Sequence, residues 1–267
     1  MKKIFTYVFL FLIILLSAGC KKSRHGLTLV DGVLTVGVEI GYPPMEYYDT
    51  NGTLAGFDIE LTKALAEKLG LEVKYIDTAW EGIFAGLDTG RYDIAVNVTI
   101  LPQRQENYNF TRPYIDSSIT YVTLKNSSVK IKEPQDIAGL RVSYQGDTTA
   151  QYFSEKLIRQ GVMFSFFSYD KIINCFDDLR VVRVDLVIVD NIVAFDYAAK
   201  PDSLFEVIWQ GPSDEYIGIC LKKGNDSLTG ALNDALDELF ADGALRNISF
   251  RIFGKDLIGK RVSSAGT

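Results

Sequence analysis

The feature that most restricts the fold of this chain is a regular alternation of short apolar strands with amphipathic helices. The segment 92–98 is mostly apolar, as expected of a strand that helices cover on both faces of a parallel sheet. The segment 58–70 places leucines every four residues on one helical face; Asp58 can cap its start and Gly70 fits its end. This alternation predicts an α/β fold with a doubly wound sheet.

The same order of elements occurs twice along the chain. In the first part, strands are expected at 33–39, 71–76 and 92–98, and helices at 58–70 and 81–88. In the second part, strands are expected at 141–144, 163–167, 185–190 and 206–209, and helices at 149–159, 170–180 and 191–199. A final amphipathic helix is expected at 227–240. No sequence repeat is obvious, so it is the architecture that is doubled.

Two α/β units of this size predict two lobes joined by two extended connections, at 114–119 and 213–217. We expect lobe 1 to comprise 29–115 and lobe 2 to comprise 116–212, while 213–267 returns to lobe 1 and adds C-terminal helices. Ligands in open α/β sheets bind at the carboxyl ends of the strands. Because those ends face each other in a two-lobed protein, we expect a ligand cleft between the lobes.

The N-terminal segment differs in composition from the rest of the chain. Two lysines precede a short apolar run, and small residues then lead to Cys20, which is typical of a secretory signal. The end of this segment resembles a bacterial lipoprotein signal, although Ser17 stands where a large aliphatic residue is usual. The resemblance implies that 1–19 is a signal peptide, that lipidated Cys20 anchors the protein to a membrane, and that 20–28 is a tether. An ordinary cleaved signal or an uncleaved anchor is the alternative.

Charge and residue content exclude several classes of function. The formal net charge is −6, which argues against a nucleic-acid partner because phosphate binding needs clustered Lys and Arg. The single histidine, His25, lies in the polar tether, so catalytic Ser–His and Cys–His arrangements are excluded. Cys175 and Cys220 lack the spacing of a metal site or a redox pair. A disulfide between them and two buried free thiols both remain open.

Five stretches, in order, resemble the signatures of the bacterial extracellular solute-binding proteins for polar amino acids. They are GYPPMEYYDTNGTLAGFDIELTKALAEKLG, TAWEGIFAGLDTGRYDIAVNVTILPQR, GLRVSYQGDTTAQYF, VDLVIVDNIVAFDY and YIGICLKKGNDSLTGALNDALDELFADGALRNI. The resemblance covers residues 30–254 and implies a periplasmic-binding-protein type II-like fold, with two α/β lobes joined by two hinge strands. It also implies a substrate-binding lipoprotein of an amino-acid ABC importer, located in the periplasm or cell envelope. Such a protein captures a free amino acid by hinge closure and delivers it to a permease in the inner membrane. A monomer without cofactor or metal is expected.

The turn ILPQR carries residue types that suit a carboxylate. In similar proteins the arginine at the position of Arg104 pairs with the α-carboxylate of the ligand, since a planar guanidinium supplies two charge-assisted hydrogen bonds. The resemblance also implies that Thr99 donates to this carboxylate and that the backbone carbonyl of Asn97 accepts from the ligand's amino group. Pro102 fits the first turn of a short helix, whereas Leu101 replaces the usual cap. A surface ion pair is the alternative role of Arg104.

Lobe 2 is expected to contribute a second set of contacts. Asp190 closes an apolar strand, where a carboxylate is costly unless it is paired, and the resemblance places it against the ligand's ammonium group. Thr148 and Thr149 open a helix, whose free N–H groups attract an anion; in similar proteins the second of this pair binds the carboxylate. Asp147 replaces the common glycine of the turn. For Asp190 and the two threonines, helix capping is the alternative.

The side-chain subsite determines which amino acid is expected. Tyr42 and Trp80 match aromatic positions that sandwich the ligand side chain, with an ordinary core position as the alternative. Glu39 follows the first strand, where relatives carry an acidic residue that reaches the distal end of the ligand; its alternative is a solvated strand end. Gln145 matches a variable pocket position. A carboxylate in an aromatic slot suits a cation, so a basic amino acid is expected. Glutamine is the main rival because an amide can also donate to Glu39.

Two other classes of function remain open. A dehydratase subset of this fold uses a pocket carboxylate as general acid, a role that Glu39 or Asp190 could take on a substrate such as prephenate or arogenate. A ligand-sensing module for a separate membrane receptor is the other class, although no second long hydrophobic segment occurs in the sequence. No nucleophile–base pair or phosphate loop is evident, so we expect a binding protein and not an enzyme.

Overall fold

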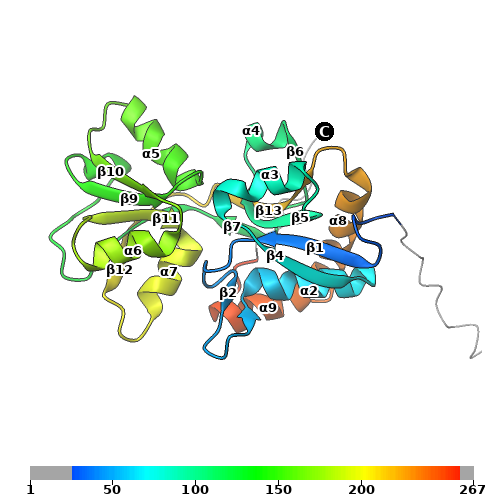
Figure 1. Cartoon of the computed structure of the whole chain (residues 1–267). Helices are drawn as coiled ribbons and strands as arrows, with labels where there is room; N and C mark the ends of the chain where they lie inside the picture. Colours follow the sequence, from blue (N-terminus) through cyan, green and yellow to red (C-terminus); the bar gives the residue numbers. More distant parts are fainter. Residues whose placement is uncertain (1–25, 259–267) are drawn as a thin grey trace, which may run out of the picture.

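A computed structural model describes residues 26–258 of the chain. It consists of two lobes that lie side by side, each built around its own sheet with helices packed against it (Figure 1). The predicted α/β fold with two lobes is confirmed. The predicted signal peptide, the lipidation site Cys20 and the histidine His25 lie outside the described residues.

Lobe 1 is built on a sheet with the strand order β4-β1-β5-β13-β6, and β7 also pairs with β13. The strands are β1 (Val33–Val38), β4 (Glu72–Asp77), β5 (Ile94–Thr99), β6 (Tyr108–Phe110), β7 (Ile115–Ser117) and β13 (Glu215–Lys222). The helices are α2 (Phe57–Leu69), η1 (Trp80–Gly82), α3 (Ile83–Asp88), α4 (Pro102–Gln105), α8 (Asp226–Ala241) and α9 (Ala244–Phe253). A small hairpin of β2 (Tyr47–Tyr48) and β3 (Leu54–Ala55) precedes α2.

Lobe 2 repeats this plan with the strand order β10-β9-β11-β8-β12. The strands are β8 (Ile119–Leu124), β9 (Arg141–Gln145), β10 (Ser165–Tyr169), β11 (Leu186–Asp190) and β12 (Phe205–Gln210). The helices are η2 (Pro134–Ile137), α5 (Thr149–Arg159), α6 (Ile172–Arg180) and α7 (Asn191–Ala199). In both lobes, three neighbouring strands are parallel, as the sequence predicts.

Each sheet also contains antiparallel strands that the sequence pattern did not predict. In lobe 1, β13 is antiparallel to β5, and in lobe 2, β8 is antiparallel to β11. The chain passes into lobe 2 through β7 and returns through β13, and these two strands pair with Glu215 opposite Ser117. β8 and β13 therefore enter their sheets from the boundary between the lobes, whereas the parallel strands end there. This connectivity explains the opposite direction.

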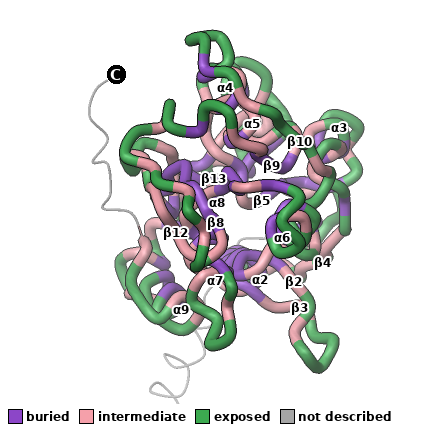
Figure 2. The backbone as a smooth tube through the Cα atoms, turned by 90° about the vertical axis from the view of Figure 1, so that its left-hand side faces the viewer, coloured by how far each residue is buried: buried purple, intermediate pink, exposed green. Residues whose placement is uncertain are grey.

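Helices cover both faces of each sheet, so the central strands are buried, as the purple course of β5, β9 and β13 in Figure 2 shows. On one face of lobe 1, Leu34 and Val36 of β1 pack with leucines of α2 and α8. On the other face, α3 packs against β5 through Ile83 and Leu87. Lobe 2 has a separate apolar core on each face of its sheet.

The start of α2 differs from the prediction. Asp58 was expected to cap this helix, but the N-cap residue is Gly56, and no side chain caps the helix there. Asp58 is instead completely buried, and its carboxylate accepts a hydrogen bond of 2.8 Å from the Tyr114 hydroxyl. The predicted end is correct, because Gly70 adopts the left-handed conformation that closes a helix.

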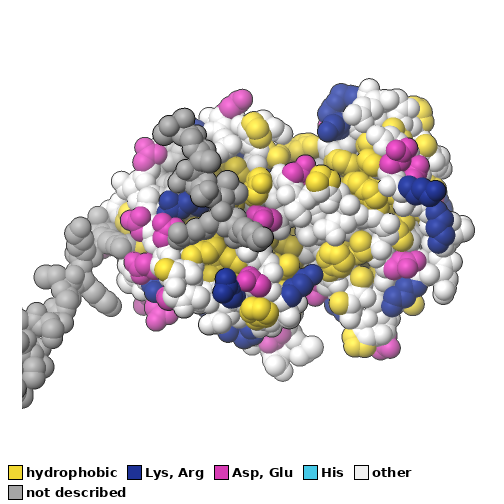
Figure 3. Space-filling model, turned by 180° about the vertical axis from the view of Figure 1, so that it is seen from behind, with side chains coloured by type: hydrophobic (Ala, Val, Ile, Leu, Met, Phe, Trp, Pro, Cys, Tyr) yellow, Lys and Arg dark blue, Asp and Glu magenta, His cyan; other side chains and the backbone are white. Residues whose placement is uncertain are grey.

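Cys175 and Cys220 are both buried and free, and they belong to the cores of different lobes. Of the two possibilities left open by the sequence, the structure has free thiols. Within residues 26–258, no cluster of acidic, histidine or cysteine side chains has the form of a metal site. Over the same range, no helix has the length and apolar character of a membrane span. On the face seen in Figure 3, positive and negative side chains are interspersed.

Candidate ligand site between the lobes

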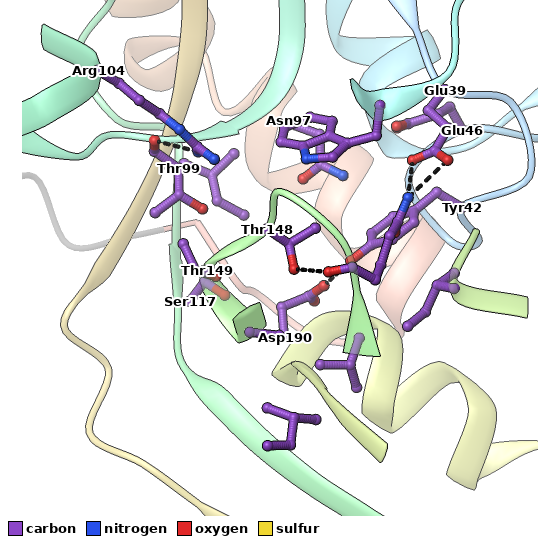
Figure 4. Close-up of a pocket in the computed structure, with 17 residues that line it drawn as sticks. Glu39, Tyr42, Glu46, Asn97, Thr99, Arg104, Ser117, Thr148, Thr149 and Asp190 are labelled. Atoms are coloured by element: carbon purple, nitrogen blue, oxygen red, sulfur yellow. Dashed lines mark hydrogen bonds between the residues drawn. The ribbon is translucent and has the colours of Figure 1, made fainter. Parts of the chain in front are cut away.

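A pocket lies between the lobes, and residues from both lobes line it (Figure 4). Its lining comprises Glu39, Tyr42, Glu46, Trp80, Asn97, Thr99, Arg104, Ser117, Gln145, Thr148, Thr149, Ala150, Ile172, Ile188, Val189, Asp190 and Ile217. Several of these follow the carboxyl ends of strands, which is the position that the α/β architecture predicts for a ligand. The ten residues predicted for the ligand site all belong to this lining. Their individual contacts with a ligand stay predictions.

Arg104 reaches the pocket from α4. Pro102 is the first residue of this short helix, as predicted, and Leu101 makes no capping hydrogen bond. Arg104 is only 6% exposed. Its Nη1 donates to the carbonyl of Thr99 at 3.1 Å, and its Nη2 donates to the carbonyl of Asp147, in lobe 2, at 3.1 Å. The Nε atom is buried without a hydrogen-bond partner.

The surface ion pair considered as an alternative for Arg104 is wrong. The side chain is buried, and no ion pair among the described residues includes it. Burial lowers the pKa of the Arg104 guanidinium from its usual value, but an arginine stays charged in proteins. Glu215 lies near enough to act on the guanidinium electrostatically but forms no ion pair with it. A buried cation without an ion-pair partner is a suitable site for a carboxylate.

Aromatic rings surround the guanidinium of Arg104. Its central carbon lies 5.6 Å from the ring centre of Trp80, 5.1 Å from that of Phe84 and 5.8 Å from that of Tyr152. Cations over aromatic faces are stabilised by the ring quadrupoles. The rings therefore hold Arg104 in place while its N–H groups remain directed along the pocket. Phe84 and Tyr152 were not among the predicted residues.

Asn97 lies where β5 is distorted. Its φ of 56° is in the left-handed region, which Asn tolerates better than most residues. The pairing of β5 with β13 shifts register between Gly218 and Cys220, opposite this residue, as at a β-bulge. The Asn97 backbone N–H donates to the Tyr114 hydroxyl at 3.0 Å, and the side chain lies next to Glu46. The bulge thus turns an amide toward the pocket from the middle of a buried strand.

The turn before α5 brings lobe 2 against lobe 1. Asp147, which stands where glycine is common in similar proteins, has a φ of 58°, so it adopts the left-handed conformation that glycine would supply. Its backbone N–H donates to Gln151 Oε1 at 2.8 Å. Its carbonyl accepts from Trp80 Nε1 at 3.0 Å as well as from Arg104. The aspartate therefore preserves a turn that contacts the other lobe.

The two threonines after this turn have different hydrogen bonds. Thr148 occupies the N-cap position of α5 but makes no side-chain capping bond, because its hydroxyl donates to the Gln145 carbonyl at 2.7 Å. Side-chain capping, the alternative role for Thr148, is therefore wrong. Thr149 is the first residue of α5, and its side chain lies next to Glu215 of β13. Its backbone N–H belongs to the unpaired first turn, which favours an anion.

Asp190 caps a helix, which is the alternative role suggested by its sequence position, and it also lines the pocket. One carboxylate oxygen, Oδ1, accepts from the backbone N–H groups of Ile192 at 2.9 Å and Val193 at 3.0 Å and so caps α7. The other, Oδ2, accepts from the hydroxyl of Tyr42 in lobe 1. Burial raises the pKa of Asp190, while the hydrogen bonds from Tyr42 and the helix lower it. The cap fixes the carboxylate in the pocket.

Glu39 is buried, so its alternative role as a solvated strand end is wrong. It is 6% exposed, and both of its carboxylate oxygens accept from Gln145 Nε2 at 2.8 Å. The same Gln145 nitrogen donates to the Asp170 carbonyl at 2.9 Å. Burial raises the pKa of Glu39 from 4.5 to about 7, although Gln145 and Lys171 oppose the shift. Figure 4 shows Glu39 near Glu46 and Tyr42.

Glu46 and Ser117 line the pocket but were missed by the sequence reasoning. Glu46 is 3% exposed and lies between Met45 and Tyr47. A lone acidic residue within an apolar and aromatic run is costly to bury, and this signal could have identified it. Ser117 belongs to β7, and its hydroxyl donates to Asn191 Oδ1 at 3.2 Å. No comparable sequence signal marks a serine in a connecting segment.

Comparisons with known proteins agree with this architecture. The family of bacterial extracellular solute-binding proteins, family 3, matches residues 34–255. The chain is 36% identical over 228 residues to the L-cystine-binding protein TcyJ of Escherichia coli strain K12, which covers 85% of this chain and 84% of the relative. An ancestral arginine-binding protein bound to arginine has 33% identity and a TM-score of 0.79, covering 84% of this chain and 99% of that one. An ancestral arginine-binding protein bound to glutamine has 33% identity and a TM-score of 0.78, covering 85% and 100%. The extent of the family match and these identities establish that the chain belongs to the bacterial extracellular solute-binding proteins, family 3.

Proposed function

We propose that this protein is the substrate-binding component of an amino-acid ABC importer, with a basic L-amino acid as its ligand. In this role it binds the free amino acid between its lobes, closes around it and delivers it to a membrane permease. The observation that carries the proposal is the buried guanidinium of Arg104. It lies in a pocket between two lobes, and no acidic side chain of the described protein forms an ion pair with it.

The α-carboxylate of the ligand is proposed to bind between Arg104 and the start of α5. Arg104 offers charge-assisted hydrogen bonds from lobe 1, with Thr99 beside it. From lobe 2, the free backbone N–H groups at Thr148 and Thr149 add the positive end of a helix. A carboxylate held in this way contacts both lobes, so it favours their closure.

The α-ammonium group is proposed to pair with Asp190. The Oδ2 atom of Asp190 faces the pocket, while Oδ1 is committed to α7. The backbone carbonyl of Asn97 is the proposed second acceptor, on the distorted part of β5. Carboxylate and ammonium groups would then bind at separate points of the pocket, which fixes the orientation of the amino acid.

The distal end of the ligand is proposed to be a cation. Glu39 supplies a buried carboxylate that neighbours Tyr42 and Gln145 (Figure 4). Among the residues that line the pocket, Arg104 is the only lysine or arginine, so no lining cation opposes a second positive charge near Glu39. An ammonium or guanidinium group there gains an ion pair and contacts with aromatic rings. Arginine and lysine fit this description.

Two neutral or zwitterionic ligands compete with this assignment. Glutamine can donate its side-chain amide to Glu39, and a related ancestral protein has been solved with glutamine bound. Cystine is the second candidate because the relative at 36% identity is named a cystine-binding protein. Cystine also carries a second ammonium group, from which Glu39 could accept a hydrogen bond. We rank both below a basic amino acid because a buried carboxylate favours a net positive partner.

A thermal-shift panel tests the ligand assignment. The twenty amino acids and cystine are each added in excess to the same protein preparation, and the apparent melting temperature is recorded. A bound ligand raises apparent stability by mass action. We expect the largest shifts with arginine and lysine. If glutamate or a small apolar amino acid gives the largest shift and the basic amino acids give none, the proposed role of Glu39 is wrong. Turnover of prephenate or arogenate, measured in a separate assay, would instead indicate that the protein is a dehydratase.

Lipid attachment is part of the proposal and is tested separately. Cys20 is proposed to carry the lipid that holds a monomeric protein at the membrane of the cell envelope, because the sequence before it resembles a lipoprotein signal. The expected result is that wild-type protein sediments with membranes and that Cys20→Ser moves it into the soluble fraction. Equal distribution of the two proteins would show that Cys20 is not the anchor.

A further inference from the structure

Two buried carboxyl groups lie together below the Glu39 end of the pocket. Glu46 lines the pocket and is 3% exposed, and Asp58, at the start of α2, is completely buried. Glu46 Oε2 and Asp58 Oδ2 are both buried without a hydrogen-bond partner, and the two carboxyl groups lie near enough to share a hydrogen bond. Figure 4 shows Glu46 beside Glu39, above Tyr42. The pair therefore connects the distal part of the ligand site with the core of lobe 1.

The chemistry of this pair requires a proton. Ionised carboxylates only accept hydrogen bonds, so a hydrogen bond between Glu46 and Asp58 needs a protonated carboxyl. Asp58 Oδ1 already accepts from the Tyr114 hydroxyl at 2.8 Å. Glu46 Oε2 and Asp58 Oδ2 are buried and receive no hydrogen bond from other groups of the described protein. A proton held by the pair is the donor that remains.

The surroundings of the pair favour retention of protons. The groups that face it are Glu39 after β1, Tyr42 before β2, Tyr75 in β4, Asn97 in β5 and Tyr114 before β7. None of them is a cation, and no ion pair of the described residues includes Glu46 or Asp58. Burial raises the pKa of both carboxyls, and the nearby Asp58 raises that of Glu46 further. A cation brought into the pocket would change this balance.

We propose that Glu46 is a further selectivity residue of the ligand site, and that the Glu46–Asp58 pair releases a proton when the cationic end of a ligand enters the pocket. One carboxyl O–H bond breaks, the proton passes to solvent, and the resulting negative charge faces the ligand cation. This release takes place in molecules whose two carboxyls are both protonated before binding, so the pair keeps one shared proton and its internal hydrogen bond. A neutral amide displaces no proton, and the pair then distinguishes arginine or lysine from glutamine. This inference rests on the proposed binding of a basic amino acid.

The test counts protons released per ligand bound. Arginine is titrated into the full protein by calorimetry at pH 7 in buffers of different ionisation enthalpy, for wild type, Glu46→Gln and Asp58→Asn. Burial raises the pKa of Asp58 to about 7, so the Asp58 carboxyl is about half protonated at pH 7. We therefore expect wild type to release about half a proton more than either variant, and we expect this difference to disappear at pH 9. Glutamine, if it binds, should show no such difference. Glu39→Gln measures the separate contribution of Glu39, which both pair variants retain.

Two results would overturn the inference in distinguishable ways. If arginine binds wild type and both variants with the same proton release, the pair takes no part in binding, while the proposed function stands. If no basic amino acid binds wild type, the proposed selectivity and this inference fail together. Glu46→Gln and Asp58→Asn each retain an N–H donor for the partner carboxyl. Two variants are used so that the proton release can still be compared with wild type if one variant does not fold.

Discussion

Asp190 caps α7 through Oδ1, whereas Oδ2 accepts from Tyr42 across the pocket, and this division leads to a prediction. Asp190→Asn keeps a side-chain oxygen that can cap α7 but removes the negative charge. We expect arginine to bind about 10–100-fold more weakly, since hydrogen bonds to charged groups contribute roughly 1.5–3 kcal/mol. The analogue without the α-amino group, 5-guanidinopentanoic acid, should lose less than about threefold.

Calorimetric titration of both ligands into wild type and Asp190→Asn measures these losses. Thermal unfolding of the variant, which we expect to be close to that of wild type, is the control for the cap. Equal losses of affinity for the two ligands would mean that Asp190 caps α7 but does not bind the ammonium group.

Glu39 should make stability depend on pH. Its pKa is raised from 4.5 to about 7 in the folded protein, so over this interval the folded state holds a proton that the unfolded state has lost. Stability therefore falls as pH rises through this window. Glu39→Gln removes this dependence and, at pH 8, should be more stable than wild type by up to about 3 kcal/mol, since each pKa unit corresponds to about 1.4 kcal/mol.

Urea unfolding of wild type and Glu39→Gln at pH 4.5 and pH 8 tests this prediction. The difference between the two proteins should be small at pH 4.5 and large at pH 8. Glu67→Gln, at an exposed position of α2, is the matched control and should show no such change. A constant difference between wild type and Glu39→Gln at both pH values would contradict the assigned pKa.

At the scale of elements, the start of α2 depends on Gly56. Its φ is 124°, and an added Cβ would lie 2.1 Å from the Met45 carbonyl oxygen. Backbone strain of this kind costs about 1–3 kcal/mol, and the steric clash adds to it. We expect Gly56→Ala to lower the free energy of unfolding by at least about 2 kcal/mol. Because Asp58 follows two residues later, ligand affinity should fall as well.

Gly230→Ala is the matched control for this prediction. Gly230 lies inside α8, and no atom lies within 4 Å of an added Cβ. Alanine should stabilise the helix by about 0.5–1 kcal/mol. Urea unfolding measures the stability of both variants relative to wild type. A Gly56→Ala protein as stable as wild type would show that the backbone at Met45 can shift to make room for the added Cβ.

The sequence predicted the parallel strands and most helices because their apolar pattern is local. The range of α5, 149–159, agrees with its prediction at both ends, as does that of α7, 191–199. The direction of β8 and β13 could not be predicted, because it depends on where the chain crosses between the lobes. The role of Asp58 was wrong for a related reason: the pattern around a helix start does not reveal a tertiary partner such as Tyr114.

The residues of the candidate site were predicted mainly through the family resemblance. That resemblance identified Arg104 and Asp190, whose side chains reach the pocket. It did not identify Glu46, although a lone acidic residue in an apolar and aromatic run is a signal for such a site. Its neighbour Asp58 could not be predicted, because no property of a single acidic residue shows which second carboxyl it will meet in the fold. The resemblance also could not reveal that the carbonyl of Asp147 accepts from Arg104 and Trp80, since that contact depends on how the lobes meet.

At the scale of the whole molecule, hydrogen bonds connect the two lobes across the pocket. They join Tyr42 to Asp190, Glu39 to Gln145, and both Trp80 and Arg104 to the carbonyl of Asp147. Closure therefore brings groups of opposite lobes into the same site. A ligand that contacts both lobes is expected to shift the population toward this closed arrangement.

Tryptophan emission can report this closure. The chain has two tryptophans: Trp80 donates to Asp147 across the pocket, whereas Trp209 packs with Tyr121 and Phe153 in lobe 2. We expect arginine to change the emission of Trp209→Phe, which retains Trp80, and to leave the emission of Trp80→Phe nearly unchanged. A ligand response carried by Trp209 alone would contradict closure at Trp80.

The measurement that tests the central claim most directly is a calorimetric titration of L-arginine into wild type and Arg104→Ala. A guanidinium fork makes two hydrogen bonds to a carboxylate, each contributing roughly 1.5–3 kcal/mol, so the variant should bind at least about 100-fold more weakly. Arg159→Ala, at an exposed position of α5, is the control and should bind like wild type. Circular dichroism should show that both variants are folded. Unchanged affinity in a folded Arg104→Ala protein would contradict the claim that this buried arginine receives the carboxylate of an amino acid.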